Sequence, residues 1–206
     1  MTDHTHLGPW DSLTPSETAT LFADYRGRWC IAGGWALDLF TGVQSREHGD
    51  VDVLIERKDL SLLHGTLPDW ELHAASGTTT LWEAGTALPD GVHDIWCRQR
   101  TGQRDGPWRF QLMVVNTDAS TGEWHFRRDD RIRGPLGTMT LMREGIPILA
   151  PEIQLLYKSK LPNRAKDEAD FATVAPHLPP TQRNWLANAI TLLYTNHPWL
   201  PTLRGG

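Results

Sequence analysis

The stretch "GGWALDLFTGVQSREHGDVDVLI" covers residues 33–55 and carries the pattern that decides the fold. Its second half predicts a strand over 50–56, in which Asp50 and Asp52 interrupt an apolar run. Residues two apart in a strand point to the same face, so both carboxylates are expected to project in parallel. Such a pair repels unless one acid is protonated or a cation lies between them. The pattern alone fits a Mg²⁺ site as well as a solvent-facing strand whose first acid ends a loop.

A Gly-Gly turn lies just upstream of the two aspartates. Gly33 and Gly34 end the strand predicted over 28–34 and begin a short helix, which Gly42 is expected to stop. Free backbone N–H groups at such a helix start form an anion site. The turn is neither a Walker loop nor a dinucleotide fingerprint, because both patterns are missing. A phosphate cradle next to a carboxylate pair therefore predicts a site for a phosphorylated ligand with a metal ion.

The rest of the chain predicts a mixed α/β arrangement. A capping box at Thr14 predicts a helix to about residue 25, and another helix is expected over 57–66. Four short strands follow as a β-meander, with a hairpin turn at 101–107. Helices are expected at about 151–161, 165–177 and 180–196. This order predicts an α+β fold, with a mixed-sheet core over 1–149 and a C-terminal helical segment over 150–206, as two parts or one compact unit.

Composition excludes several classes of protein. The chain has 206 residues, 39% hydrophobic content and a formal net charge of −5, as expected of a globular domain and not of a protein that binds nucleic acid. Cys30 and Cys97 lie in apolar runs and are predicted to be reduced core residues. No signal peptide and no apolar run of ~18 residues is found, which predicts a cytoplasmic protein without a membrane span.

The central stretch closely resembles the core motif of the nucleotidyltransferase superfamily. The resemblance is to aminoglycoside 2″-adenylyltransferase-like and lincosamide nucleotidyltransferase-like proteins, whose pattern is Gly-Gly-Trp-Ala/Gly followed by Arg-x-His-x-Asp-x-Asp. Here the second half of that pattern is Arg46, His48, Asp50 and Asp52. A weaker resemblance continues over 145–171.

The resemblance implies transfer of an NMP from a nucleoside triphosphate to a hydroxyl group. It assigns the phosphates to Gly33 and Gly34, and Mg²⁺ to the catalytic acids Asp50 and Asp52. Metal ions can neutralise the charge on the transferring phosphoryl group, so the physical chemistry agrees.

Three further residues are expected to bind the nucleotide. By the same resemblance, Arg46 and His48 contact phosphates or orient the aspartates. On the helix predicted over 151–161, Lys158 and Lys160 point to different faces, and Lys158 is the one expected to reach the triphosphate. Asp167 and Asp170, which follow on the next helix, are interpreted as members of a solvated, charge-paired face.

One position departs from the family pattern. These proteins usually carry a third carboxylate on a later neighbouring strand, and Gln111 occupies the place where it is expected. An amide oxygen can ligate a metal, but the group cannot accept a proton at neutral pH. Asp94 on the hairpin partner strand is the carboxylate best placed to substitute as a catalytic residue, with Glu83 a more distant candidate.

The expected partners are a nucleoside triphosphate and a small hydroxylated acceptor, of which an aminoglycoside- or lincosamide-like antibiotic is one candidate. A net negative charge suits a cationic acceptor. A toxin-like enzyme that modifies a protein or tRNA is an alternative, although "FRRDDRIRG" (126–134) is the sole arginine-rich stretch. A non-catalytic nucleotide-binding protein is the third alternative. The apolar last helix is consistent with a homodimer.

Overall fold

The computed structural model describes residues 8–101 and 106–205. The strands are β1 (Trp29–Ala32), β2 (Asp52–Glu56), β3 (Trp70–Ser76), β4 (Thr78–Leu81), β5 (Asp94–Gln99), β6 (Phe110–Asp118), β7 (Glu123–His125), β8 (Arg133–Pro135), β9 (Thr140–Arg143) and β10 (Ile146–Leu149). The α-helices are α1 (Pro15–Leu21), α2 (Gly33–Thr41), α3 (Leu63–Thr66), α4 (Pro151–Lys158), α5 (Ala165–Val174), α6 (Pro180–Leu193) and α7 (Leu200–Arg204). Three 3₁₀ turns complete the elements: η2 (Arg57–Leu62), η3 (Leu136–Thr138) and η4 (Ala175–His177).

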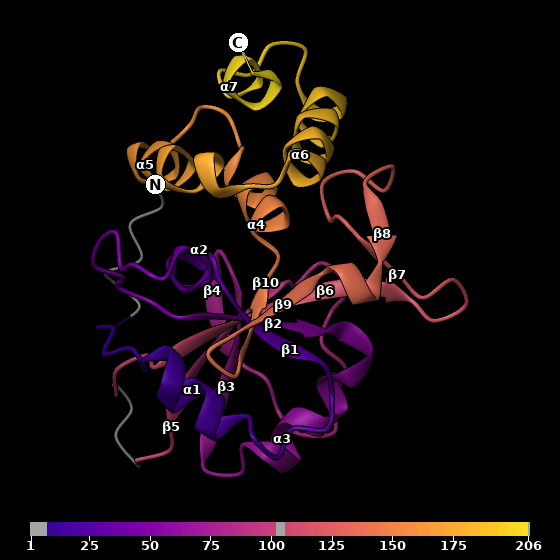
Figure 1. Ribbon diagram of the computed structural model, residues 1–206. Coiled ribbons are helices and arrows are strands. Elements are labelled where there is room, and N and C mark those ends of the chain that lie inside the picture. Colours follow the sequence, from indigo (N-terminus) through magenta and orange to yellow (C-terminus); the bar gives the residue numbers. More distant parts are fainter. Residues whose placement is uncertain (1–7, 102–105, 206) are drawn as a thin grey trace.

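A mixed sheet forms the centre of the molecule (Figure 1). Its main path runs β4-β3-β5-β6-β2-β1-β10-β9, and β7 and β8 extend it from β6. Strand β2 pairs in parallel with β6, and β1 pairs in parallel with β10, whereas β1 and β2 are antiparallel. The α+β fold with a mixed sheet, predicted from the sequence, is confirmed.

Several local predictions hold, with shorter elements than expected. Thr14 and Glu17 form the capping box of α1, and Gly42 ends α2 in the left-handed conformation at φ 76°. Helix α1 ends at Leu21 because Phe22 turns inward into the core. The helix expected over 57–66 begins as the 3₁₀ helix η2. Its three-residue repeat places Leu60 on the same buried side as Leu63, the first residue of α3.

The strand that carries the aspartates starts later than predicted. The ladder of β2 begins at Asp52, so Asp50 lies in the chain before the strand and not within it. The backbone is nevertheless anchored between the two acids, because the backbone N–H of Gln111 donates to the backbone carbonyl of Val51 at 2.9 Å. The buried Val51 side chain separates the acids, and both carboxylates line the same pocket.

The central strands are buried, and the sheet positions the site. Cys30 on β1 and Cys97 on β5 are fully buried free thiols, as predicted. Strands β5 and β6 form the antiparallel pair expected of a hairpin, although residues 102–105 of its turn lie outside the described residues. In the described part of the chain, no helix is long and apolar enough to cross a membrane.

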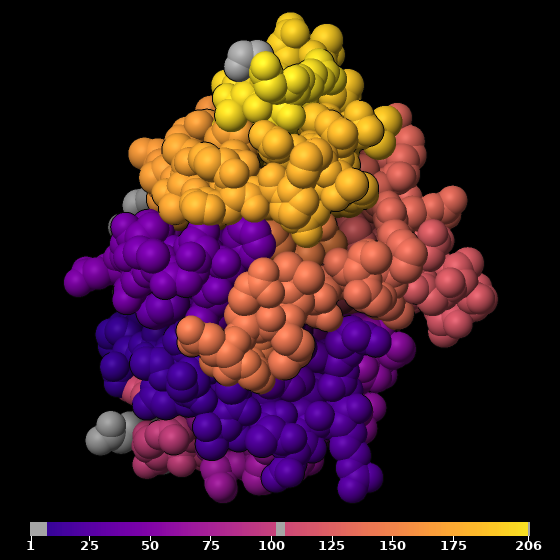
Figure 2. Space-filling view, viewed as in Figure 1, coloured from indigo at the N-terminus to yellow at the C-terminus, as the bar shows by residue number. Residues whose placement is uncertain are grey.

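The C-terminal helices rest on the Gly-Gly helix. Helices α4 and α5 contact α2, and α6 packs against α4 (Figure 1). The orange and yellow C-terminal segment sits directly on the purple segment that includes α2 (Figure 2). This packing brings residues of α4 and α5 to the site, whereas the division of the chain at residue 149 stays a prediction.

Candidate active site

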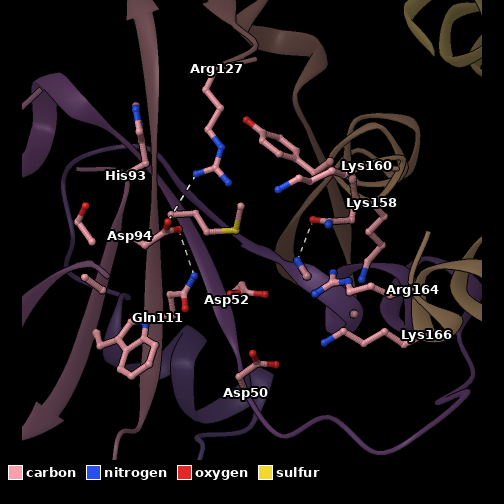
Figure 3. A pocket seen from close by; sticks show the side chains of 18 of the residues that line it. Asp50, Asp52, His93, Asp94, Gln111, Arg127, Lys158, Lys160, Arg164 and Lys166 are labelled. Atoms are coloured by element: carbon pink, nitrogen blue, oxygen red, sulfur yellow. Dashed lines mark hydrogen bonds and ion pairs between the residues drawn. The ribbon is translucent and has the colours of Figure 1, made fainter. Parts of the chain in front are cut away.

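A pocket of about 750 Å³ opens where β1 and β2 meet α2 (Figure 3). It collects side chains from the N-terminal segment, the sheet and the C-terminal helices. The lining residues are Trp10, Gly33, Gly34, Arg46, Asp50, Asp52, Ala75, Ser76, Gly77, Thr78, Gly91, His93, Asp94, Trp96, Gln111, Met113, Arg127, Gln154, Tyr157, Lys158, Lys160, Arg164 and Lys166. Most of the predicted site residues therefore come together in one place. His48 and Glu83 are not among the lining residues.

Gly33 has a conformation and a neighbour that exclude a side chain. Its φ of 67° lies in the left-handed region, and an added Cβ would lie 2.2 Å from Oδ2 of Asp52. Its amide donates to Oε1 of Gln154 at 2.8 Å, in a buried hydrogen bond that ties α4 to the turn. Ala32 gives α2 no side-chain cap. The helix therefore starts directly at the Asp52 carboxylate.

Gly34 explains why the two halves of the sequence motif occur together. A Cβ on Gly34 would lie 2.3 Å from the His48 ring and 2.6 Å from Nη2 of Arg46. These distances are shorter than real Cβ contacts, so the loop before Asp50 closes on α2 only when glycine is present. The Gly-Gly turn and the Arg-x-His segment thus fit against each other.

His48 faces helix α2. Its Nε2 lies 2.5 Å from Oδ2 of Asp38, and its ring packs on Trp35 at 4.5 Å between centroids. Ser45 donates to the other oxygen of Asp38 at 2.7 Å. The His48 side chain is only 2% exposed. Of the two roles that the resemblance implied, this geometry suits the orientation of the aspartate loop.

Arg46 connects the same loop to helix α5. It donates from Nε and Nη2 to the two oxygens of Asp170, at 2.9 and 3.2 Å. Lys158 lies 2.8 Å from Asp170 and 3.4 Å from Asp167, and Arg164 donates to Asp167 at 2.6 Å. The interpretation of Asp167 and Asp170 as a solvated face is therefore wrong. Both are almost fully buried. Arg164 is a local partner of Asp167, as the charge spacing suggested, whereas Arg46 and Lys158 come from other elements of the fold.

The Asp52 carboxylate lacks such neutralisation. Burial, together with the charges of Asp50 and Asp94, raises the pKa of Asp52 to about 7, against the opposing charges of Lys158 and Lys166. The result is a concentration of negative charge at the end of β2. A bound cation would relieve it.

Gln111 lies where the third carboxylate was expected. It is the register partner of Asp52 across β2 and β6, on a strand next to the one that carries Asp52. Its Nε2 donates to Oδ1 of Asp94 at 3.2 Å, and Nη1 of Arg127 lies 3.6 Å from Oδ2 of the same residue. Asp94 is one-third exposed, so it faces the pocket and can be reached by a ligand.

The donor set fits a hard divalent cation. Asp50 and Asp52 offer carboxylate oxygens, and Gln111 offers an amide oxygen beside them. Among the described residues, no group of three or more His, Cys, Asp or Glu side chains could hold a metal by itself. This arrangement suits Mg²⁺, which binds through one or two protein carboxylates and takes its other ligands from water and phosphate oxygens.

Several pocket residues were missed by the sequence reasoning. Arg127 follows a short strand and shows no motif, and Gln154 belongs to a helix whose polar residues look like surface. Arg164 reaches the pocket from the connection between α4 and α5, and Lys166 from the first turn of α5 (Figure 3). Lys160 also lines the pocket, although Lys158 was the lysine expected to reach the triphosphate. Only the weak resemblance over 145–171 gave a signal for this part of the site.

A mixed sheet with a Gly-Gly turn next to a strand-borne aspartate is the nucleotidyltransferase type of fold. The model of the aminoglycoside-2″-adenylyltransferase family matches residues 17–80, which include both halves of the motif. The resemblance to the aminoglycoside and lincosamide nucleotidyltransferase-like proteins is thereby confirmed. No curated protein matches the chain at a significant level.

Solved structures share the fold at low sequence identity. The lincomycin-bound lincosamide antibiotic adenylyltransferase LnuA is 17% identical, with a TM-score of 0.54 over 80% of this chain and 98% of its own. ANT(2″)-Ia in complex with adenylyl-2″-tobramycin is 12% identical, with a TM-score of 0.53 over 94% and 100%. An antigenic nucleotidyltransferase-like protein from Paracoccidioides brasiliensis is 20% identical, with a TM-score of 0.50 over 92% and 89%.

Proposed function

We propose that the protein is a Mg²⁺-dependent nucleotidyltransferase that moves an NMP from a nucleoside triphosphate to a hydroxyl group of a small acceptor. One observation carries the proposal: the uncompensated carboxylate of Asp52 lies against the Gly33 turn, at the start of a helix without a side-chain cap. A phosphate group and a divalent cation are the complementary charges for such a junction. The antibiotic adenylyltransferases that share the fold support the same class of reaction.

Asp50 and Asp52 would hold Mg²⁺, with the Gln111 amide oxygen as a third protein ligand. When bound, Mg²⁺ supplies neutralisation of the charge that develops on the transferring phosphoryl group. The fit rests on the oxygen donors and on the raised pKa of Asp52, which reflects burial and the nearby Asp50 charge. A cation in the site offsets the repulsion between the two carboxylates and stabilises the ionised form of Asp52.

Cations on the opposite wall of the pocket would bind the triphosphate. Lys160 and Arg164 in the α4–α5 connection, and Lys166 in the first turn of α5, face the two aspartates (Figure 3). Lys158 is buried against Asp167 and Asp170, so we assign it the role of placing this wall, with its charge felt by Asp52. The negative phosphate tail then lies between the helix start and these cations.

Asp94 would act as the general base. The acceptor oxygen attacks the α-phosphorus and its proton passes to Asp94, while the bond to the β-phosphate oxygen breaks and pyrophosphate leaves. Gln111 supports this role because it donates to Oδ1 of Asp94 and fixes the carboxylate in place. The amide at the third position thus leaves the proton acceptor one strand further along the sheet.

Two alternatives remain to be separated by experiment. A non-catalytic nucleotide-binding protein is favoured by Gln111 alone. A toxin-like enzyme acting on a protein or tRNA would need a basic surface. Of the arginines of 126–134, Arg127 is paired with Asp94 in the pocket, Arg131 with Asp129 and Arg133 with Glu123 on β7. The pocket itself suits a small acceptor.

The class of reaction is tested by heat stabilisation and turnover. ATP and GTP are each added with and without Mg²⁺, and the unfolding temperature of the protein is measured. We expect stabilisation that requires Mg²⁺, followed by pyrophosphate release when an acceptor panel is added. Stabilisation that is indifferent to Mg²⁺ would reject the metal site.

The general base is tested by Asp94→Asn. We expect the variant to bind nucleotide with Mg²⁺ as the wild type does, but to transfer about a hundredfold more slowly, the lower end of what a general base contributes. Equal turnover in wild type and variant would show that Asp94 takes no proton. Turnover absent in both, with intact nucleotide binding, would favour the non-catalytic alternative.

A further inference from the structure

The pocket is lined by a group of acidic side chains, a group of basic ones and a group without Asp, Glu, Lys or Arg (Figure 3). Its acidic lining residues are Asp50, Asp52 and Asp94, and its basic ones are Arg46, Arg127, Lys158, Lys160, Arg164 and Lys166. The four basic residues between 158 and 166 belong to the C-terminal segment, and Arg46 joins them from the loop before β2 through Asp170. Arg127 stands apart from this group, beside Asp94 (Figure 3). Arg46, Lys158 and Arg164 are paired with Asp167 and Asp170, so Arg127, Lys160 and Lys166 are left to face the three acids. The pocket therefore carries no excess of negative charge, although the whole chain carries −5.

None of the three acids is left over for a positively charged acceptor. On the proposed function, Asp50 and Asp52 are taken by the metal. Asp94 accepts a hydrogen bond from Gln111 on one oxygen and faces Arg127 at 3.6 Å on the other. An ammonium group brought to this end of the pocket would meet one carboxylate that already has a cation beside it. Like charges placed together in this way act against a wrong partner.

The wall on the sheet side carries no Asp, Glu, Lys or Arg. Its residues come from the N-terminal segment, strands β3 to β6, the β3–β4 turn and the loop before β5: Trp10, Ala75, Ser76, Gly77, Thr78, Gly91, His93, Trp96 and Met113. Trp10 and Trp96 form an edge-to-face pair, with ring centroids 5.2 Å apart and an interplanar angle of 70°. Aromatic faces with a few hydroxyl and backbone groups bind amphipathic molecules.

We propose that the acceptor is an amphipathic hydroxyl compound with at most one positive charge, and that Arg127 is the residue that excludes polycations. This inference rests on the proposed function and narrows its acceptor. The apolar face of the acceptor lies on the tryptophan wall, which brings a hydroxyl group to Asp94. It reverses the expectation drawn from net charge, because the charges that a ligand meets are those lining the pocket.

Two probes with opposite charge distributions test the inference. Lincomycin carries one amine and an apolar side, whereas tobramycin carries several ammonium groups. Binding of each to the full chain is measured calorimetrically, with a non-hydrolysable ATP analogue and Mg²⁺ present, at about 0.15 M ionic strength, where exposed charges further apart than about 8 Å are screened. We expect lincomycin to bind at least tenfold more tightly than tobramycin.

The variant Arg127→Gln then tests the residue. Removing this cation exposes Asp94, so tobramycin affinity should rise about three- to fivefold, as expected for one partly exposed charge pair, with lincomycin affinity unchanged. Arg133→Gln serves as the matched control, because Arg133 belongs to the same arginine-rich stretch, is 56% exposed and lies outside the pocket lining. It should change neither affinity.

Three results would overturn the inference: tobramycin binding as tightly as lincomycin in the wild type, neither probe binding, or an unchanged preference in Arg127→Gln. The ATP analogue is titrated first, in the same series. Loss of Mg²⁺-dependent nucleotide binding would reject the proposed function. Intact nucleotide binding with a preference for tobramycin would reject only the acceptor class.

Discussion

The chain contains two closely spaced pairs of aspartates whose surroundings are opposite. Asp50 and Asp52 face a pocket, and burial together with the Asp50 charge raises the pKa of Asp52 to about 7. Asp167 and Asp170 are buried on α5. Burial alone would raise the pKa of Asp170, but hydrogen bonds from Arg46 and Lys158 outweigh it and hold that pKa below its usual range.

The difference shows what separates a ligand site from a structural cluster. The α5 pair is electrically complete, because Arg46, Lys158 and Arg164 surround it. The pair at β2 is incomplete, so it has capacity for a cation from outside the protein. The two pairs are linked, since Arg46 extends from the loop before Asp50 to Asp170. The pair on α5 therefore holds, through Arg46, the loop that leads to Asp50 and Asp52.

The largest expected effect is on the incomplete pair. Asp52→Asn removes a carboxylate whose metal would supply several kcal/mol of charge stabilisation, so nucleotidyl transfer should fall about a hundred- to a thousandfold. The fold should lose no stability, and near neutral pH it should gain some, because the carboxylate has no hydrogen-bonded cation to leave behind and its ionised form is disfavoured by burial. Steady-state pyrophosphate release and urea unfolding measure the two effects.

Asp24→Asn is a suitable control for Asp52→Asn. Asp24 is exposed and distant from the pocket lining, so both transfer and stability should stay at wild-type values. If Asp52→Asn unfolds the protein as readily as it reduces transfer, Asp52 resembles the structural pair and the comparison is lost.

Asp170→Asn should give the reverse result. It leaves the buried Lys158 and the Arg46 guanidinium without their shared carboxylate, and removal of one partner from a buried pair costs about 3–5 kcal/mol. Urea unfolding should register this loss of stability. Transfer should fall only in proportion to the unfolded fraction and to the loosening of the Arg46 loop.

A second substitution shows whether Asp170 stabilises the α5 cluster through its charge or through its packing. In Asp170→Asn with Lys158→Met, the buried cation is removed along with its partner, so part of the lost stability should return. If the double variant is as unstable as the sum of the two single variants, the pair is not coupled and Asp170 acts through packing alone.

The sequence alone predicted the fold class and the part of the site formed by residues 33–55. The Gly-Gly turn and the aspartate strand could be predicted because their constraints are local: a left-handed Gly33, a short helix stopped by Gly42, and a buried run after Asp52. The family pattern also pointed to Gln111 on a later neighbouring strand, and the structure pairs that residue with Asp52. Assignments of nucleotide and metal to these residues stay predictions.

The rest of the site depends on contacts between residues far apart in the chain. Arg46 and Asp170 are separated by 124 positions, and Gly33 and Gln154 by 121. Charge spacing on α5 alone therefore suggested a solvated face, since nothing local reveals that Arg46 covers Asp170. Arg127 was missed for the same reason. Arg127 follows β7, and it lies beside Asp94 of β5 because β7 and β5 both pair with β6.

Gly34→Ala tests the contact that joins the motif halves, with a smaller expected effect. The new Cβ would press on the His48 ring and on Arg46, and overpacking of this kind costs about 1–3 kcal/mol. We expect lower stability and weaker nucleotide binding together, measured by urea unfolding and by Mg²⁺-dependent heat stabilisation. Gly49→Ala is the control in the same loop, because its added Cβ would have no atom within 4 Å. Equal effects of the two substitutions would mean that backbone freedom, and not the His48 contact, matters.

The smallest effect concerns the pH dependence of stability in the presence of a chelator. A carboxyl group whose pKa is raised in the folded state binds more protons there than in the unfolded chain, so its contribution to stability falls as pH rises from about 4 to about 7. Asp170, with its lowered pKa, contributes stability that is lost only below this window. His64, His73 and His197 have pKa values lowered chiefly by burial, so their contribution rises with pH near 6. These groups are common to wild type and Asp52→Asn, so the difference between the two unfolding free energies isolates Asp52. That difference should grow in favour of the variant between pH 5 and pH 7, and a constant difference would show that the Asp52 carboxylate is already neutralised within the folded protein.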